Sequence, residues 1–301
     1  LGAGVIYPIW RDALPEKRKV KDFRQRCKRL LKDGILSTTI LTLTTLPLIC
    51  YYFYEIPLLG LIPNLLILLT LNGVMIPGVL GIGAGLFSLI VGKILLLPVW
   101  GLLELYEILL KMIRNIPWSV YICGQPQLWQ ISIYYICYLT VTYIIWWNMN
   151  RKEKDGCCKR RSRNKGKEVF WGAHRQRFIW MANITLLVAG ICLLLWRPSV
   201  EMSLTILDVG QGDSIVLRSG KYCFLVDGGS SSEKQVGTYR ILPYLKSQGV
   251  QNLDGIIITH MDEDHMNGIL ELLEKVEKRE SVIRIQRLFL PVWMKGREEE
   301  I

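Results

Sequence analysis

Long apolar segments constrain the fold of this chain more than any other feature of its sequence. Ile35–Tyr54, Leu128–Met149 and Phe178–Trp196 contain no charged side chain. Each is close to the length of about twenty residues that an α-helix needs to cross the hydrocarbon core of a bilayer. Buried helices of a soluble protein would not need so much uninterrupted apolar sequence, so these segments are predicted to be transmembrane helices.

The stretch Ile56–Trp100 is apolar almost throughout, with four prolines and Lys93 as its only charged residue. It can hold two spans, or one span and a re-entrant segment. Gly81 and Gly85 form a pair of small residues four apart, which lets helices approach closely. Glycines in this pattern also favour broken helices around a cavity, so both arrangements stay open.

The next segment, Pro98–Arg114, has a different pattern. Glu104, Glu107, Lys111 and Arg114 recur at steps of three and four on an otherwise apolar helix. Such a helix either lies flat in the membrane interface or lines a wet path inside a helix bundle. The interfacial interpretation is favoured because it requires no buried charge.

The distribution of charge predicts how the chain crosses the membrane. Residues 11–33 carry ten Lys and Arg against four acidic residues, and residues 149–177 carry eleven against three. Both segments are therefore predicted to be cytoplasmic by the positive-inside rule. An even number of crossings must separate them, most simply four, and a fifth span then places the chain from Glu201 onward on the outer face.

Charge also separates the two halves of the chain. Residues 1–200 hold 25 Lys and Arg against 10 Asp and Glu, whereas residues 201–301 hold 12 against 16. The basic side chains thus lie beside apolar segments, as membrane topology produces. The overall charge of +11 therefore does not indicate a nucleic-acid-binding domain.

A candidate metal site follows one short strand. Residues 255–268 read GIIITHMDEDHMNG, in which an apolar β-branched run ends at Thr259 and His260, Asp262, Asp264 and His265 follow within six residues. Two imidazoles and two carboxylates suit a divalent cation such as Zn²⁺ or Mn²⁺. The alternative is a polar loop in which Asp264 caps the next helix. Two of the three histidines of the chain lie here, which favours the metal site.

The spacing His-x-Asp-x-Asp-His resembles the signature of the metallo-β-lactamase fold, in which His-x-His-x-Asp-His is usual. Residues 207–214 (LDVGQGDS) and 224–229 (FLVDGG) resemble the opening strands of the subfamily that is fused to ComEC-type DNA-uptake channels. That subfamily typically carries Asp at the position of Asp262.

This resemblance implies roles for single residues. His260 and Asp262 would serve one metal ion, and Asp264 with His265 the second. Asp227, at the end of a strand, would orient water or a ligand from behind, although an ordinary Asp-Gly-Gly turn is its alternative. Asp227 and Asp264 are thus the candidate catalytic residues. Asp213 receives less weight, because the glycines around it are enough to shape a turn.

The membrane half resembles the ComEC-family competence domain more loosely. Residues 51–66 (YYFYEIPLLGLIPNLL) match it in Phe53, Pro57 and Gly60, while Pro63 stands where a small residue is expected. The order of the parts strengthens the resemblance. The chain is therefore predicted to contain a basic cytoplasmic segment (1–34), a multi-span competence-type membrane domain (35–149), a basic cytoplasmic loop (150–177), a final transmembrane helix (178–197) and a partial metallo-β-lactamase-like domain (201–301).

Within the last segment the pattern predicts two hairpins followed by strand–helix–strand units, the first half of an αββα sandwich. The predicted strands are Ser203–Asp208, Ser214–Arg218, Tyr222–Asp227, Gly255–Thr259 and Val282–Leu290, and the predicted helices are Thr238–Gln248 and Gly268–Lys278.

The cysteines form no recognisable framework. Cys157, Cys158 and His174 lie in the basic loop without a second pair at zinc-site spacing, so this loop is predicted to be solvated. The others are scattered: Cys27, Cys50, Cys123, Cys137, Cys192 and Cys223. Cys223 is expected to be a buried, small apolar residue.

The resemblance implies a DNA-uptake channel of the bacterial cell membrane for natural transformation. Its extracytoplasmic hydrolase domain, with one or two Mn²⁺ or Zn²⁺ ions, would degrade one DNA strand while the other passes through the membrane. Other competence proteins or further copies of the chain would be its partners. Two alternatives remain: a membrane-tethered hydrolase acting on another ester or amide, and a channel with an inactive hydrolase domain.

The chain starts at Leu1 without an initiator Met and contains no histidine after His265. It is therefore interpreted as a fragment whose remaining ligands lie beyond Ile301. On this interpretation it binds metal weakly, hydrolyses nothing, and leaves Leu225, Ile256 and Ile258 without their covering layer.

Overall fold

The computed structural model describes residues 2–13, 23–158, 181–198 and 200–291. It divides into two units. The first comprises Leu1–Pro47, Leu61–Trp100 and Pro126–Trp196. The second comprises Leu48–Gly60, Gly101–Gln125 and Arg197–Ile301.

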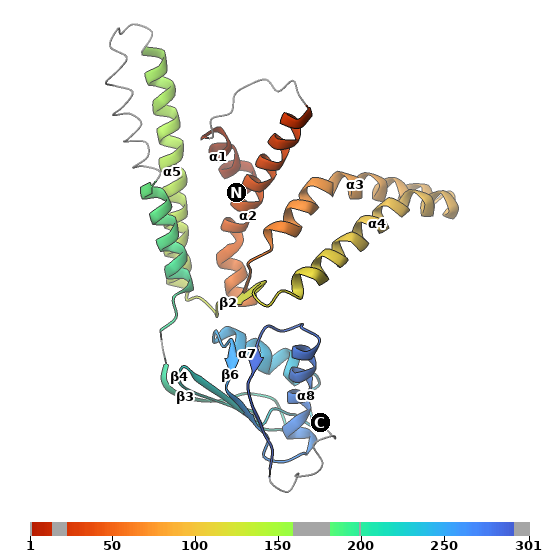
Figure 1. Ribbon diagram of the computed structural model, residues 1–301, viewed down its shortest axis with the longest axis vertical. Coiled ribbons are helices and arrows are strands. Elements are labelled where there is room, and N and C mark those ends of the chain that lie inside the picture. Colours follow the sequence, from red (N-terminus) through yellow and green to blue (C-terminus); the bar gives the residue numbers. More distant parts are fainter. Residues whose placement is uncertain (1, 14–22, 159–180, 199, 292–301) are drawn as a thin grey trace. The chain divides into compact units, whose positions relative to one another are not determined.

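Four described helices are long and apolar enough to cross a membrane (Figure 1): α2 (Phe23–Phe53), α3 (Leu61–Gly85), α4 (Leu89–Arg114) and α5 (Leu128–Cys158). This agrees with the four spans predicted between the two basic segments. The fifth predicted span appears as a shorter apolar helix, Met181–Leu195, and its first residues, 178–180, lie outside the described residues, as do 159–177 of the basic loop. A short π-helical turn, η1 (Gly2–Ile6), and α1 (Tyr7–Ala13) precede α2.

Hydrogen bonds in the first unit join α2 to α5. Pro47 lies inside α2 and has no N–H, so the carbonyl four residues earlier, that of Leu43, loses its helical partner. The hydroxyl of Tyr134 on α5 donates to this carbonyl at 2.7 Å, and the hydroxyls of Tyr138 and Thr44 lie 3.0 Å apart. Both tyrosines are 1% exposed. Each polar group among the apolar residues thus has a partner, as a helix pair in lipid requires.

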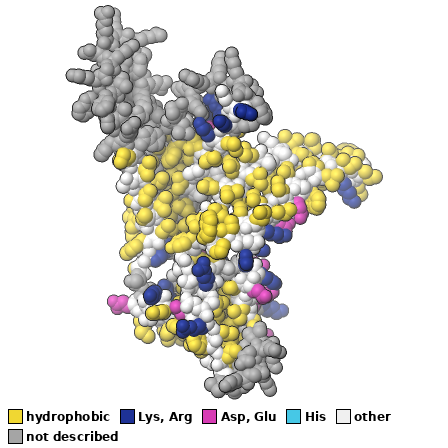
Figure 2. Space-filling model, in the orientation of Figure 1, with side chains coloured by type: hydrophobic (Ala, Val, Ile, Leu, Met, Phe, Trp, Pro, Cys, Tyr) yellow, Lys and Arg dark blue, Asp and Glu magenta, His cyan; other side chains and the backbone are white. Residues whose placement is uncertain are grey.

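The apolar stretch after residue 56 forms the two helices α3 and α4, not one span with a re-entrant segment. Small residues let them approach: a Cβ added to Gly92 would lie 2.7 Å from the Cα of Gly85. Large apolar side chains on both helices are exposed, and Figure 2 shows apolar side chains along them with few charges. The segment Pro98–Arg114, predicted to be an amphipathic helix, is the second part of α4, which continues through Pro98 without a break; its place in the membrane interface stays a prediction.

The second unit contains a five-stranded sheet in the order β3-β4-β5-β7-β9. Its strands are β3 (Val200–Ile206), β4 (Ile215–Gly220), β5 (Tyr222–Val226), β7 (Gly255–Ile257) and β9 (Leu288–Phe289). The first three are antiparallel, and β7 and β9 then add in parallel. Two smaller pairs complete the strands: β6 (Asn252–Leu253) with β8 (Arg284–Ile285), and β1 (Glu55–Pro57) with β2 (Val120–Ile122).

The helices of this unit are η3 (Gly237–Ile241), α7 (Leu242–Ser247) and α8 (Glu263–Glu277). Leu225, Ile256 and Ile258 are at most 2% exposed and share a core with Ile241 and Ile269 from these helices. The expectation that these three side chains are left uncovered was therefore wrong. The exposed apolar face belongs to β3, where Met202, Leu204 and Ile206 are 59–72% exposed.

The predicted elements differ from the observed ones mainly at their ends. The strand predicted for Val282–Leu290 is divided into β8 and β9, which pair with different neighbours. The helix predicted for Gly268–Lys278 begins earlier, at Glu263. Glu263 and Asp264 lie in its first turn, where acidic side chains interact favourably with the helix dipole.

Residues before and after the apolar helices pack into the hydrolase-like core. Ile122 of β2 is 2% exposed and belongs to the same core cluster as Leu245 and Leu253. The N–H of Gln125 donates to the carbonyl of Ser247 at 2.7 Å. The β1–β2 hairpin is therefore a structural part of the second unit.

Candidate metal centre

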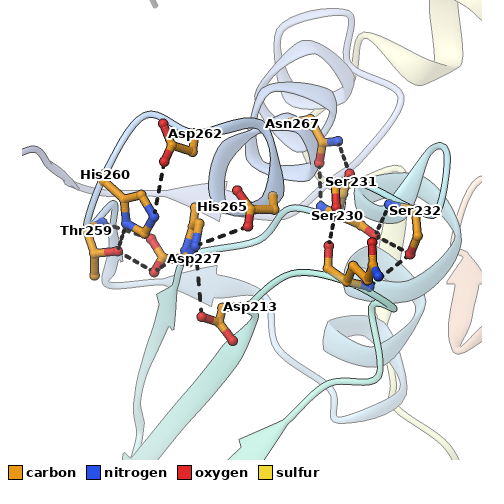
Figure 3. Close-up of polar contacts among 12 residues, drawn as sticks. Asp213, Asp227, Ser230, Ser231, Ser232, Thr259, His260, Asp262, His265 and Asn267 are labelled. Carbon is orange, nitrogen blue, oxygen red and sulfur yellow. Dashed lines mark hydrogen bonds and ion pairs between the residues drawn. The ribbon is translucent and has the colours of Figure 1, made fainter.

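Two successive elements place the two histidine rings next to each other, tilted by 46°. His260 lies in the loop after β7, and His265 lies near the start of α8. Their ring centroids are 3.5 Å apart, and His265 is buried whereas His260 is half-buried (Figure 3). Two imidazole rings this close together can contribute ligands to the same metal site.

Asp227 supports this pair from behind. The parallel pairing of Val226 with Ile257 brings the end of β5 beside the loop that carries Thr259. Asp227 is 4% exposed, and its carboxylate accepts hydrogen bonds from the Thr259 N–H (2.8 Å) and the Thr259 hydroxyl (2.6 Å). Its φ of 55° is a conformation that non-glycine residues adopt infrequently.

The same carboxylate determines the orientation of His265. Nδ1 of His265 lies 3.1 Å from Oδ2 of Asp227, and an ionised carboxylate only accepts, so Nδ1 carries the proton. Nε2 is then the unprotonated nitrogen that can bind a metal ion. A carboxylate that fixes the tautomer of a ligating histidine is a common feature of metal sites.

Other carboxylates lie near the Nε2 atoms of both histidine rings. His265 Nε2 lies 3.7 Å from Oδ2 of Asp264 and 3.9 Å from Oδ2 of Asp213, and His260 Nε2 lies 3.7 Å from Oδ2 of Asp262. These separations exceed a hydrogen bond. They are near the roughly 3.4 Å that separates two tetrahedral ligands with metal bonds of roughly 2.1 Å. The four residues predicted as metal ligands therefore lie together and fit a divalent cation.

Two groups of three residues have ligand atoms within 4.8 Å of one another: Asp227, His260 and His265, and His260, Asp262 and Asp264. His260 belongs to both, so the structure does not divide the four ligands into the two pairs that the resemblance implies. Both oxygens of Asp227 already accept hydrogen bonds. This favours a supporting role for Asp227 over direct ligation.

Asp213 received little weight in the sequence, yet it lies at the site. Its N–H donates to the carbonyl of Asp264 at 3.1 Å. The preceding Gly212 makes this approach possible, because a Cβ there would lie 2.6 Å from the Asp264 carbonyl and closer still to that of Gly229. The glycines before Asp213, in the pattern GxGD of residues 210–213, thus indicated in the sequence that another backbone segment approaches closely here.

Asn267 is a second residue that the sequence did not single out. Its side-chain oxygen accepts from the Ser230 N–H at 3.0 Å, and its amide donates to the Ser230 carbonyl at 2.6 Å (Figure 3). Ser230 is 1% exposed and lies three residues after Asp227. Asn267 therefore connects the helix that carries His265 to the loop that carries Asp227.

The structure tests the alternative in which Asp264 caps the helix. The N-cap of α8 is Asp262, with an extended backbone and no side-chain capping hydrogen bond. Asp264 lies within the first turn of the helix. The capping alternative was therefore wrong, and neither carboxylate is occupied by the helix end.

Comparisons with known proteins match two separate parts of the chain. Residues 5–149 match the family model described as "Competence protein", and residues 207–299 match the "Metallo-beta-lactamase superfamily". The chain is 37% identical over 71 residues to "Competence protein ComA" of Neisseria gonorrhoeae, covering 24% of this chain and 10% of that protein. It is 34% identical over 109 residues to "ComE operon protein 3" of Bacillus subtilis, covering 31% of this chain and 13% of that protein.

The chain therefore aligns with only about a tenth of the length of these curated relatives. No solved structure matches it significantly.

Proposed function

We propose that this chain, in which residues 5–149 match the competence-protein family model and residues 207–299 match the metallo-β-lactamase superfamily model, belongs to a DNA-uptake channel whose hydrolase domain cleaves one strand of the entering duplex. The observation that carries the hydrolase half is the cluster of His260, Asp262, Asp264 and His265 supported by Asp227. Its donor set of imidazoles and carboxylates fits divalent metal ions.

A bound divalent metal would supply an activated water and neutralise charge on a phosphate. The residues of the chain prepare this chemistry. Asp227 holds the proton on Nδ1 of His265 and leaves Nε2 free. Asp264, half-buried at the start of α8, offers its carboxylate to the same place.

The carboxylates support Mn²⁺ as the working metal. Asp262 stands where related sites have a second histidine, and exchange of an imidazole for a carboxylate makes the site harder, which favours Mn²⁺ over Zn²⁺. Mn²⁺ is therefore expected to support activity at least as well as Zn²⁺. Activity with Zn²⁺ alone would contradict this role of Asp262.

The hydrolase domain is proposed to lie on the outer face of the membrane. β1 follows α2 and β2 precedes α5, so two helices, α3 and α4, lie between the paired strands. If both helices cross the membrane, the two strands lie on one side, which agrees with their pairing. The packing of Ile122 into the core of the second unit supports the same side for the hydrolase domain, opposite the basic segments.

The test is a nuclease assay with full-length protein on end-labelled linear duplex DNA, in Mn²⁺ and in Zn²⁺. Metal-dependent loss of one strand, abolished in His265→Ala, is the expected result. Glu274→Gln is the matched control, because Glu274 is an exposed acid on the same helix that pairs with Lys278. Full strand cleavage by His265→Ala would exclude this site as the nuclease centre.

A second candidate is a tethered hydrolase for a substrate other than DNA. The excess of acidic residues in 201–301, 16 against 12 Lys and Arg, favours it, because a net negative charge opposes the binding of a polyanion such as DNA. The same assay separates the two: cleavage of a generic phosphodiester without cleavage of DNA would support this candidate.

A further inference from the structure

Cys50 and Cys123 are far apart in the sequence but meet in the second unit. Cys50 lies in the last turn of α2, and Cys123 directly follows β2. The N–H of Cys123 donates to the carbonyl of Tyr54 at 2.9 Å, and Glu55 pairs with Ile122 in the hairpin. The backbone thus brings the residue after β2 back to the end of α2.

The two side chains are buried together. Cys50 is fully buried and Cys123 is 3% exposed. Their thiols are within hydrogen-bonding distance of each other. Three further cysteines lie away from this pair: Cys137 in α5, Cys192 in the helix Met181–Leu195 and Cys223 in β5.

Arg197 adds a positive charge near the thiols of Cys50 and Cys123. Its guanidinium donates to the carbonyl of Gly124 at 3.0 Å. The hydrogen bond from the Cys50 thiol lowers the pKa of Cys123; burial opposes this effect, and the charge of Arg197 adds to it. Cys123 is therefore the thiol of the pair better suited to attack as a thiolate.

We propose that Cys50 and Cys123 form a disulfide that ties the end of α2 to the β1–β2 hairpin. The proposal rests on the outward orientation of this unit proposed above, since disulfides persist in oxidising compartments. The backbone contacts and the buried thiol pair are the observations that carry it.

The oxidant is a disulfide-bearing protein of the extracytoplasmic thiol-oxidase class. The Cys123 thiolate attacks the oxidant disulfide and forms a mixed disulfide with release of one oxidant thiolate. The Cys50 thiolate then displaces the second oxidant sulfur and forms the Cys50–Cys123 bond. The protein loses two protons and two electrons, and the oxidant becomes a dithiol. The burial of both thiols places this step before the hairpin closes over them.

The bond would enclose α3 and α4 in a covalent loop. It would restrict the unfolded chain and hold Ile122 in register with the core that it helps to fill. Along the chain, β1 follows α2 and β2 precedes α5. A disulfide there would keep the hydrolase core attached to the ends of those helices.

The experiment uses full-length protein in membranes, in an aerobically grown host with an extracytoplasmic disulfide-forming system. Thiols are trapped in acid and then labelled in denaturant with a maleimide-polyethylene glycol, with and without prior reduction. We expect the reduced sample to carry two more labels than the unreduced sample. We also expect a peptide mass in which Cys50 is joined to Cys123. In Cys50→Ser the thiol of Cys123 has lost its partner, and in Cys123→Ser the thiol of Cys50 has. Each variant should therefore show this one thiol labelled without prior reduction.

Cys223→Ser is the matched control. Cys223 is buried in the same unit but on β5, so its substitution should remove one label under both conditions. Labelling of both Cys50 and Cys123 in unreduced wild-type protein would overturn the disulfide, whatever the topology. Reporter fusions after Glu201 test the orientation separately, so a reduced pair on the outer face refutes the disulfide alone.

Discussion

The carboxylate of Asp227 determines which nitrogen of His265 faces the metal site. It accepts from Nδ1 of His265 and from two donors of Thr259. A carboxylate that accepts a hydrogen bond from a ligating histidine raises metal affinity by holding the histidine in one tautomer and one orientation. The residue therefore acts through His265, and its removal should affect metal binding before any chemistry.

We predict that Asp227→Asn lowers Mn²⁺ affinity about 10- to 100-fold. An amide offers one acceptor oxygen in place of two and sets an N–H against donors of Thr259 or His265. Isothermal titration of full-length protein with Mn²⁺ measures the change. Glu274→Gln should leave the affinity as it is, and an unchanged affinity in Asp227→Asn would refute the supporting role.

At the scale of elements, one of the hydrogen bonds that join α2 to α5 uses the carbonyl that Pro47 leaves without a helical partner. Tyr134 supplies its hydrogen bond at 2.7 Å from a position that is 1% exposed. Tyr134 of α5 thus supplies the hydrogen bond that Pro47 removes from α2, although the two residues lie on different helices. Neither residue is unusual on its own.

Tyr134→Phe is expected to destabilise the protein by roughly 0.5–2 kcal/mol, because a buried carbonyl loses its donor while the ring stays in place. Thermal unfolding in detergent measures it. Tyr143→Phe is the control, because Tyr143 lies on the same helix and is 60% exposed. Equal stability losses in the two variants would show that the bond to Leu43 is not the cause.

A second contact between elements joins β1 to α7. Nζ of Lys246 lies 2.8 Å from Oε1 of Glu55, with side chains 16% and 24% exposed. Replacing only one partner of an ion pair this well shielded from solvent is costly, because the charge of the other partner stays partly buried. It therefore orients the hairpin on the core.

Lys246→Glu should lower the free energy of unfolding by about 1–3 kcal/mol, since it sets two acids together. The double exchange Glu55→Lys with Lys246→Glu should recover part of the loss. A double-mutant cycle in urea gives the coupling energy. Additive effects of the two single changes would mean that the pair does not hold the hairpin.

At the scale of the whole molecule, charge and strand pairing point to the same topology. The basic segments 11–33 and 149–177 predict the inner side, and the β1–β2 pairing places both connections at the other end of the helices. Alkaline phosphatase fusions after Gln125 and after Glu201 should be active, and a fusion after Met149 should be inactive. Activity of both the Met149 and the Glu201 fusions would refute the five-span topology.

Sequence alone determined the features that depend on neighbouring residues. The four long helices follow from uninterrupted apolar runs, and the candidate metal ligands from a histidine and aspartate spacing that a strand end and one helical turn bring together. The order of strands and helices in residues 201–291 follows from the same local patterns. Each of these properties is encoded within about twenty residues.

Tertiary structure decided what depends on register between distant segments. The parallel pairing of β5 with β7 set Asp227 behind His265, and close backbone approach at Gly212 brought Asp213 to the site. The hairpin placed Cys123 beside Cys50. Helices η3, α7 and α8 covered Leu225, Ile256 and Ile258, which the sequence had suggested were bare. Side-chain periodicity shows which face of a strand is apolar but not which element covers it, because that choice is made by contacts between residues far apart in the chain.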